Sequence, residues 1–188
     1  MIKDGSEDTV TLRVVREHEL AKFKLDLQES FGVAAQAAFG QSLDEPIPAD
    51  EDIEESIAAP GSIVYSVLLR DERVGGAIVL IDEVRQHNSL AFFFISTSQH
   101  SRGIGHRAWQ AIERAHPRTK VWETVTPYFE KRNIHFYVNK CAFKIVEFYN
   151  TFNPDPHQKS QVGLADNEDD EMFRLQKIMD LSPGDLDK

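Results

Sequence analysis

The chain is poor in the features that mark membrane-bound, secreted and zinc-binding proteins. Its 188 residues contain one cysteine, Cys141, which excludes an internal disulfide and leaves no cysteine-based zinc pattern. No apolar run approaches the roughly 18 to 20 residues that span a bilayer. The first ten residues, MIKDGSEDTV, lack the apolar core of a signal peptide. The sequence therefore predicts a cytoplasmic protein with no membrane partner.

Positive charge is also scarce. There are 21 Lys and Arg against 31 Asp and Glu, which gives a formal net charge of −10. Binding to a nucleic acid backbone needs a basic face, so we expect no nucleic acid partner. The acidity is compatible with a cationic substrate such as an amine. The simpler interpretation is that it keeps the protein soluble.

What is present is typical of one globular domain. The chain is 41% hydrophobic and 28% charged, and 188 residues are enough for a single domain with a real core. It shows no internal repeat and no domain boundary. We therefore expect one domain over residues 1–188, with its core at about 9–180.

Hydrophobic patterning predicts alternating strands and helices in a mixed α/β order. The Gly75-Gly76 pair in the third strand indicates either close packing or a bulge. Gly32 is expected to break the first long helix in two. The predicted strands are Thr9–Arg16, Ser62–Leu69, Val74–Ile81, Ser89–Ile95, Lys120–Thr126, Phe143–Tyr149 and Met172–Ile178. The predicted helices are His18 to about Phe39, Asp50 or Asp52 to Ala59, Ile104–His116, and Asn133 to about Cys141.

A glycine turn between a strand and a helix is the most informative feature. The apolar run Leu90–Ile95 precedes the turn Arg102–Gly105, and an amphipathic helix follows until Pro117. The unpaired amides of a first helical turn and the positive end of the helix dipole favour a phosphate group. Glycine lets the backbone approach such a group closely. This stretch therefore predicts an anion site.

Two common phosphate motifs fit this turn poorly. A P-loop needs a second glycine five residues after the first, followed by Lys and Ser or Thr, whereas here His106 follows Gly103 and Gly105. A dinucleotide fingerprint accepts Ala108 in place of its third glycine. No alternating strand–helix–strand units follow, however, so that interpretation is weak.

Two motifs together resemble the GNAT acetyltransferase superfamily. His100–Gly105 is similar to its pyrophosphate loop, Gln/Arg-x-x-Gly-x-Gly/Ala, with His100 at the leading position. Asn133–Lys144 resembles its late segment, in which Asn begins a tyrosine-bearing helix that ends in Gly-Phe. Ala142 stands in place of that glycine, where a left-handed conformation costs alanine about 1 kcal/mol more.

The resemblance covers nearly the whole chain and implies a fold and a cosubstrate. The fold would be a single GNAT-like domain with a central, mixed, mostly antiparallel twisted sheet of about six or seven strands flanked by about four helices. The cosubstrate would be acetyl-CoA, with the strand end 94–96 polarising the thioester through a main-chain N–H and the amides of 102–107 holding the pyrophosphate. The expected cofactor-binding residues are Phe94, Ile95, Ser96, Ser101, Arg102, Gly103, Ile104, Gly105, His106, Arg107 and Asn133.

The roles of several of these residues stay open. Asn133 is either the N-cap of its helix or a cofactor contact. His106 either adds to the anion site or faces solvent. The histidines His100, His106 and His135 are not at metal-ligand spacing, and we expect no metal. Cys141 is expected to be a small buried hydrophobe rather than a nucleophile.

The resemblance also implies catalytic roles. Tyr137 would be the general acid that protonates the departing thiolate, since the ordinary pKa of a tyrosine, about 10, is close to that of an alkyl thiol. The alternative is a core tyrosine with a satisfied hydroxyl. The general base would be Glu123, with Asp82 and Glu83 as further candidates, and each of the three could be only a surface charge.

The function so implied is an N-acetyltransferase that acts on a primary amine, by direct attack, with a small-molecule acceptor. The alternatives are a CoA-binding sensor or structural module, and acetylation of a protein N-terminus or lysine. Acceptor selection would fall to the helices over 18–59 and the loop over 153–170. The acidic residues Asp44, Glu45, Asp50, Glu51 and Asp52 could attract a cation or form a solvated charge run. A homodimer is compatible with the sequence, which does not fix the oligomeric state.

Overall fold

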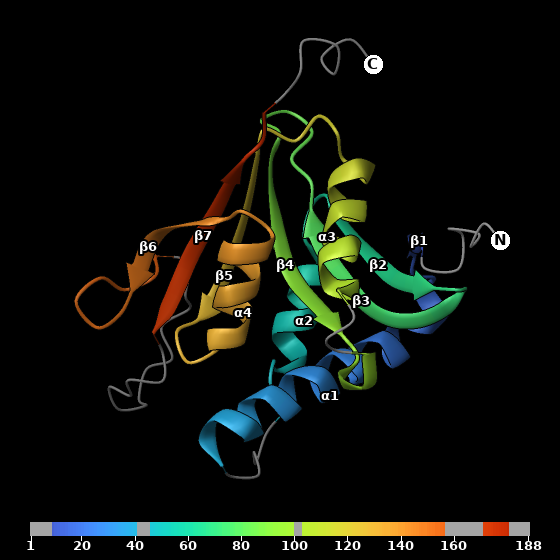
Figure 1. The fold of residues 1–188 in the computed structure, drawn as a ribbon, viewed down its shortest axis with the longest axis horizontal. Coiled ribbons are helices and arrows are strands. Elements are labelled where there is room, and N and C mark those ends of the chain that lie inside the picture. Colours follow the sequence, from blue (N-terminus) through green and yellow to red (C-terminus); the bar gives the residue numbers. More distant parts are fainter. Residues whose placement is uncertain (1–8, 41–45, 100–102, 157–170, 181–188) are drawn as a thin grey trace, which may run out of the picture.

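A computed structural model describes residues 9–40, 46–99, 103–156 and 171–180, and these form one layered α/β structure (Figure 1). A seven-stranded sheet has the order β1-β2-β3-β4-β5-β7-β6 and is antiparallel except where β4 meets β5. The strands are β1 (Val10–Val14), β2 (Ser62–Leu69), β3 (Glu72–Leu80), β4 (His87–Ile95), β5 (Val121–Pro127), β6 (Lys144–Tyr149) and β7 (Met172–Ile178). The main helices are α1 (Leu20–Phe39), α2 (Asp50–Ala58), α3 (Ile104–Ala115) and α4 (Lys131–His135), which continues as a π-helix, η3 (Phe136–Lys140).

Helices cover the sheet on both faces. On one face, α1 places Phe23 and Leu27, which are both fully buried, against Ile78 of β3 and Phe94 of β4. On the other face, Trp109 of α3 packs with Trp122 of β5 and with Phe143. Figure 1 shows α3 and α4 on one side of the strands and α1 and α2 on the other. The predicted fold class, a mostly antiparallel mixed sheet flanked by helices, is confirmed.

The expected break of the first helix at Gly32 is wrong. Helix α1 runs without interruption for 20 residues, and nothing lies within 4 Å of a Cβ placed on Gly32. A glycine inside a helix costs about 1 kcal/mol. Burial of Phe23 and Leu27 against the sheet outweighs that local cost.

The Gly75-Gly76 pair allows close packing, and an irregularity lies beside it. A Cβ on Gly76 would collide with the ring of Phe23, and one on Gly75 would collide with the carbonyl of Phe94. The β2–β3 register also shifts next to Gly75. Both interpretations of the pair are therefore correct. The missing side chain at Gly76 lets α1 lie directly on the sheet, and the one at Gly75 leaves room for the backbone of β4.

In the described ranges, no helix is both long enough and apolar enough to cross a membrane.

Candidate active site

Strands β4 and β5 separate after a short stretch of pairing. They pair in parallel only through His87–Val121, Asn88–Trp122 and Ser89–Glu123. Strand β4 continues to Ile95 against β3, whereas β5 continues to Pro127 against β7. We call the divergent region, bounded by 90–95 of β4 and 124–127 of β5, the β4–β5 fork (Figure 1).

The backbone of β4 shows which groups face the fork. The N–H of Ser96 donates to the carbonyl of Val74 on β3 at 2.8 Å. Strand residues alternate their polar groups between the two edges, so Phe94 shares the edge of Ser96 and Phe93 faces the fork. The amide of Ser96 is therefore unavailable for a thioester carbonyl. Of the predicted residues 94–96, only Ile95 shares the fork-facing edge, and Phe93, which the sequence did not indicate, joins it there.

A hydrogen bond crosses the fork at its apex. The hydroxyl of Thr124 on β5 donates to the carbonyl of Leu90 on β4 at 2.9 Å, and Thr124 is 5% exposed. Just below the apex, the buried Asn88 amide donates to Thr119 at 2.7 Å. The closed end of the fork is thus held by side chains as well as by strand pairing.

The glycine turn lies at the other end of β4. Gly103 is the N-cap of α3 with φ of 69°, and nothing lies within 4 Å of a Cβ placed on it. The first intrahelical bond runs from the N–H of Arg107 to the carbonyl of Gly103 at 3.2 Å. The N–H of Arg107 is therefore used within the helix. The amides expected to bind an anion are the ones that precede it, up to His106. The side chain of Ile104 is buried in the core. His100, Ser101 and Arg102 lie outside the described residues.

The second glycine has a different environment. A Cβ placed on Gly105 would lie 3.3 Å from Cε2 of Phe136 and 3.7 Å from Cγ1 of Ile95. The Phe136 ring also stacks on Phe93 of β4, with ring centres 5.7 Å apart and planes inclined by 10°. Phe136 therefore joins the glycine turn, the fork and the helix that carries Tyr137.

Helix α4 begins earlier than the sequence indicates. Its N-cap is Glu130, and the N–H of Ile134 donates to the carbonyl of Glu130 at 3.0 Å. Asn133 is the third helical residue, so its assignment as the N-cap is wrong. The expectation of a cofactor contact at Asn133 remains.

The turn that carries Tyr137 is wider than an α-helical turn. The N–H of Cys141 donates to the carbonyl of Phe136, five residues earlier, at 3.1 Å. The segment ends at Ala142 with φ of 62°, and the N–H of Phe143 then donates to the carbonyl of Tyr137 at 3.0 Å. Ala142 thus takes the left-handed conformation that a glycine commonly adopts just past a helix end. Turns of this π type frequently occur at functional sites.

Tyr137 lies in an aromatic environment beside the apex of the fork. It is 6% exposed, and its ring centre lies 5.3 Å from that of Phe136 and 5.5 Å from that of Phe143. Burial raises the pKa of Tyr137, Cys141 raises it further, and a hydrogen bond with the Thr124 side chain offsets this only in part. The Tyr137 hydroxyl therefore keeps its proton at neutral pH.

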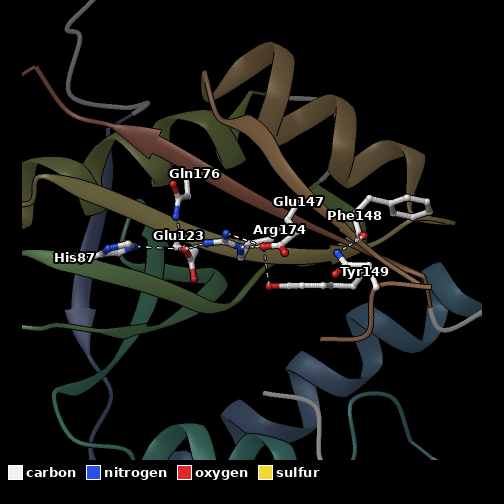
Figure 2. Close-up of polar contacts among 8 residues, drawn as sticks. His87, Glu123, Glu147, Phe148, Tyr149, Arg174 and Gln176 are labelled. Atoms are coloured by element: carbon white, nitrogen blue, oxygen red, sulfur yellow. Dashed lines mark hydrogen bonds and ion pairs between the residues drawn. The ribbon is translucent and has the colours of Figure 1, made fainter. Parts of the chain in front are cut away.

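Glu123 points to the opposite face of β5, because successive strand residues alternate. Figure 2 shows its carboxylate within a polar network. Its Oε2 accepts from Nη1 of Arg174 at 2.9 Å and from Nε2 of Gln176 at 2.6 Å, and Nε2 of His87 lies 3.4 Å away. Arg174 also donates to Oε2 of Glu147 at 2.7 Å. Burial acts to raise the pKa of Glu123, but these hydrogen bonds outweigh it, and the pKa is lowered.

The other two candidate bases have structural roles. Oδ1 of Asp82 accepts from the backbone N–H groups of Arg85 at 2.8 Å and Val84 at 3.0 Å. The bond from Arg85 contributes most to lowering the pKa of Asp82. Glu83 pairs with Arg118 at 2.6 Å. Both residues precede β4, at the end of the strand away from the glycine turn.

Cys141, His106 and His135 differ in their exposure to solvent. Cys141 is 1% exposed, and burial raises the pKa of its thiol to about 12, as expected of a small buried hydrophobe. His106 is half-buried in the first turn of α3, and His135 is exposed. Within residues 9–40, 46–99, 103–156 and 171–180, no three His, Cys, Asp or Glu side chains form a group that could hold a metal ion.

The acidic first turn of α2 is partly tied to α1. Asp50 lies 3.2 Å from Nζ of Lys24 and accepts from Gln28 at 2.8 Å. Asp44 and Glu45 lie outside the described residues. These contacts favour a structural role for Asp50 over attraction of a cation.

Sequence reasoning missed Phe93, Thr124, Phe136 and Arg174. The alternation of Thr124 with Thr126 was a signal, because threonine on a buried strand face needs a hydrogen-bond partner. For the other three residues no local signal exists, since their roles depend on contacts between distant segments.

Comparison with known proteins agrees with this geometry. Residues 24–143 match the model of the acetyltransferase (GNAT) family. The chain is 49% identical over 182 residues to the uncharacterized protein YrkN of Bacillus subtilis (strain 168), and the match covers 95% of this chain and 98% of YrkN.

Solved structures share the fold at low sequence identity. An acetyltransferase of Bacillus subtilis in complex with CoA superposes with a TM-score of 0.64 at 17% identity, covering 91% of this chain and 99% of that one. AAC(6')-Ib in complex with ribostamycin and coenzyme A gives a TM-score of 0.62 at 16% identity, covering 96% and 97% of the two chains.

Proposed function

Because the chain belongs to the GNAT acetyltransferase family, we propose that it transfers an acetyl group from acetyl-CoA to a primary amine of a small molecule. The observation that carries this proposal is the β4–β5 fork, with a glycine-capped helix at its open end and a protonated tyrosine beside its apex.

Coenzyme A fits the groups that line the fork. Its pyrophosphate would bind the amides at the start of α3, from Gly103 to His106, where the open space at Gly103 admits a phosphate. Its pantetheine amides would pair with the backbone of Phe93, as an added strand pairs with a sheet edge. Asn133, on the neighbouring helix α4, would contact the same arm. Acetyl-CoA supplies a thioester whose carbonyl carbon an amine can attack.

Tyr137 would protonate the leaving group. The amine nitrogen forms a bond to the carbonyl carbon, the carbon–sulfur bond breaks, and the sulfur leaves with the electron pair. The raised pKa of Tyr137 keeps its hydroxyl protonated before the reaction, and it also makes the hydroxyl a weaker acid than an ordinary tyrosine, so proton donation depends on the charge that develops on the sulfur. The tyrosine would then regain a proton from solvent.

Glu123 would receive the proton of the amine. Helices α3 and α4 cover the face that holds Tyr137, so the acceptor would approach from the other face, where Glu123 lies. The lowered pKa of Glu123 keeps it ionised at neutral pH, as a proton acceptor must be. A water molecule would carry the proton across any remaining distance.

The charges on this face favour a cationic acceptor. Arg174 is held between two carboxylates, Glu123 and Glu147, so the network carries one more negative than positive charge when His87 is neutral. An amine is cationic until it loses its proton. AAC(6')-Ib, which shares the fold, has been solved with ribostamycin, so a small-molecule acceptor has a precedent on this fold.

Calorimetric titration with acetyl-CoA tests the cofactor site. Gly103→Asp and Gly103→Asn are a matched pair, because both residues tolerate the left-handed conformation and differ in charge alone. We expect micromolar binding by the wild type, retained within a few-fold by Gly103→Asn. Gly103→Asp should bind at least about tenfold more weakly, because it places a carboxylate at the phosphate site. Equal binding by the two variants would contradict this placement.

Turnover tests the reaction. Wild-type protein with acetyl-CoA and a panel of small primary amines should release free thiol, and Tyr137→Phe should slow the release. The panel should include peptides with free N-termini and lysines, since turnover with these alone would favour a protein acetyltransferase. Binding of acetyl-CoA without turnover of any amine would favour a CoA-binding module.

A further inference from the structure

Phe136 contacts three parts of the proposed site that are distant in sequence. Its ring stacks on Phe93 at 5.7 Å, where β4 borders the fork. Its Cε2 and Cζ lie 3.3 and 3.5 Å from the position of a Cβ on Gly105. It also precedes Tyr137, with their ring centres 5.3 Å apart in an edge-to-face arrangement. The proposed mechanism assigns this ring no role.

These contacts separate the roles of the two glycines in the turn. Gly103 has positive φ and open space around it, so it serves the backbone conformation of the turn. Gly105 has no positive φ, and an added Cβ would meet the Phe136 ring. The missing side chain at Gly105 therefore lets the ring of Phe136 lie against the first turn of α3.

The segment that carries Tyr137 depends on such contacts for its position. Helix α4 has 5 residues and η3 has 5, and so short a helix has little stability of its own. Adjacent residues of a helix point in different directions. Phe136 faces α3 and β4, while Tyr137 faces Phe143 and the apex of the fork. Fixing the ring of Phe136 thus fixes the rotation of the segment about its axis, and with it the direction of Tyr137.

We propose that Phe136 is a positioning residue whose ring, seated on Gly105 and Phe93, aligns the tyrosine-bearing segment with the glycine turn and holds the Tyr137 hydroxyl at the fork. This inference rests on the proposed function, in which Tyr137 is the acid. It predicts that substitutions at the two glycines have different effects. Changes at Gly103 affect acetyl-CoA binding, whereas bulk at Gly105 displaces Phe136 and slows the reaction.

Steady-state kinetics with a productive amine test the role of the ring. Phe136→Ala should lower kcat by about tenfold or more, since small displacements of a catalytic group slow a reaction strongly. Phe136→Leu, which keeps most of the bulk, should lower kcat less, and the KM for acetyl-CoA should stay within about threefold in both variants. Phe152→Ala is the control, because Phe152 is 97% exposed, and its kcat should equal that of the wild type.

A second-site rescue shows whether the Phe136 ring acts through its contact with Gly105. Gly105→Val should lower kcat about as much as Phe136→Ala does, because its side chain displaces the ring. The double variant Gly105→Val with Phe136→Ala should be faster than Gly105→Val alone, because the valine then occupies the vacated space. Thermal unfolding of each variant confirms that it is folded, and Phe136→Leu replaces Phe136→Ala if the latter is not.

The outcomes separate this inference from the proposed function. No turnover by the wild type refutes the proposed function and, with it, the positioning role. Wild-type turnover with an unchanged kcat in Phe136→Ala refutes the positioning role alone. The same conclusion follows if the two substitutions combine to a larger loss than either causes. A selective fall in kcat together with rescue supports the inference.

Discussion

The two faces of β5 differ in how they hold their polar groups. On the face toward α3 and α4, Trp122 is fully buried and Thr124 and Thr126 are 5% and 2% exposed. There the Thr124 hydroxyl donates to the carbonyl of Leu90, and the Thr124 side chain also forms a hydrogen bond with Tyr137. On the other face Val125 is 43% exposed, and Glu123 forms an ion pair with Arg174.

Because of this difference, Tyr137 is protonated and Glu123 is ionised at neutral pH. Burial raises the pKa of Tyr137 on the first face, whereas charged and polar partners lower the pKa of Glu123 on the second. An acid and a base placed side by side are distinguished by such environments. In the proposed mechanism the strand separates acid and base, because Glu123 and Thr124, the hydrogen-bond partner of Tyr137, are adjacent in β5 and point to opposite faces.

The largest effect should come from the core on the buried face. Trp122→Ala should lower the free energy of unfolding by about 3–5 kcal/mol, because it leaves a cavity beside Trp109. Val125→Ala, on the open face, should change it by less than about 0.5 kcal/mol. Urea denaturation of both variants measures the contrast. Similar losses would show that the two faces are packed alike.

The charge network should contribute less, and its contribution should depend on pH. Glu123→Gln should lower the free energy of unfolding by about 1 kcal/mol at pH 7. The folded pKa of Glu123 is lowered, so this contribution is complete above the unfolded value of about 4.3 and is lost as pH falls through the folded pKa. Denaturation at pH 7 and at successively lower pH measures it. Glu72→Gln, at an exposed position, is the control. A difference that grows as the pH falls would contradict the assignment.

A backbone change should stabilise the segment that presents Tyr137. Ala142→Gly should raise the free energy of unfolding by about 0.5–1 kcal/mol, because φ of 62° strains alanine and suits glycine. Lys140→Gly, at the last helical position of η3, should have the opposite sign, since glycine is a poor helix former. Thermal or urea unfolding distinguishes the two. Destabilisation by Ala142→Gly would contradict the left-handed assignment.

The smallest effect is expected at Cys141, on the buried side. Its thiol is 1% exposed and its pKa is about 12, so a thiol-specific reagent should not label it at neutral pH in the native state. Labelling should appear only when the protein unfolds. Rapid labelling of native protein would show that this side opens to solvent. Slow labelling also gives the thiol-release assay a low background.

Features set by local chemistry could be predicted from the sequence. The strands follow from runs of apolar and β-branched residues, and the left-handed Gly103 follows from its place before an amphipathic helix. The left-handed Ala142 is of the same kind, because a helix end commonly requires that conformation. Burial of Cys141 follows from its residue type.

Features set by contacts between segments could not. Gly32 would break an isolated helix, but packing of α1 on the sheet overrides its propensity. The amide of Ser96 is engaged because of the β3–β4 register, which the sequence of β4 alone does not specify. The contact of Phe136 with Gly105 joins residues 31 positions apart. The polar network at Glu123 depends on Arg174, from the far end of the chain.

The most direct test of the central claim is the pH dependence of kcat/KM for the amine in Tyr137→Phe and Glu123→Gln. If Glu123 accepts the proton of the amine, Glu123→Gln should be slow at neutral pH and approach the wild type as rising pH deprotonates the amine in solution. Tyr137→Phe should stay slow throughout, by a factor on the order of 10²–10⁴, because no solvent pH in this range replaces its donor. Recovery of both variants, or of neither, would contradict the assignment of acid and base to opposite faces of β5.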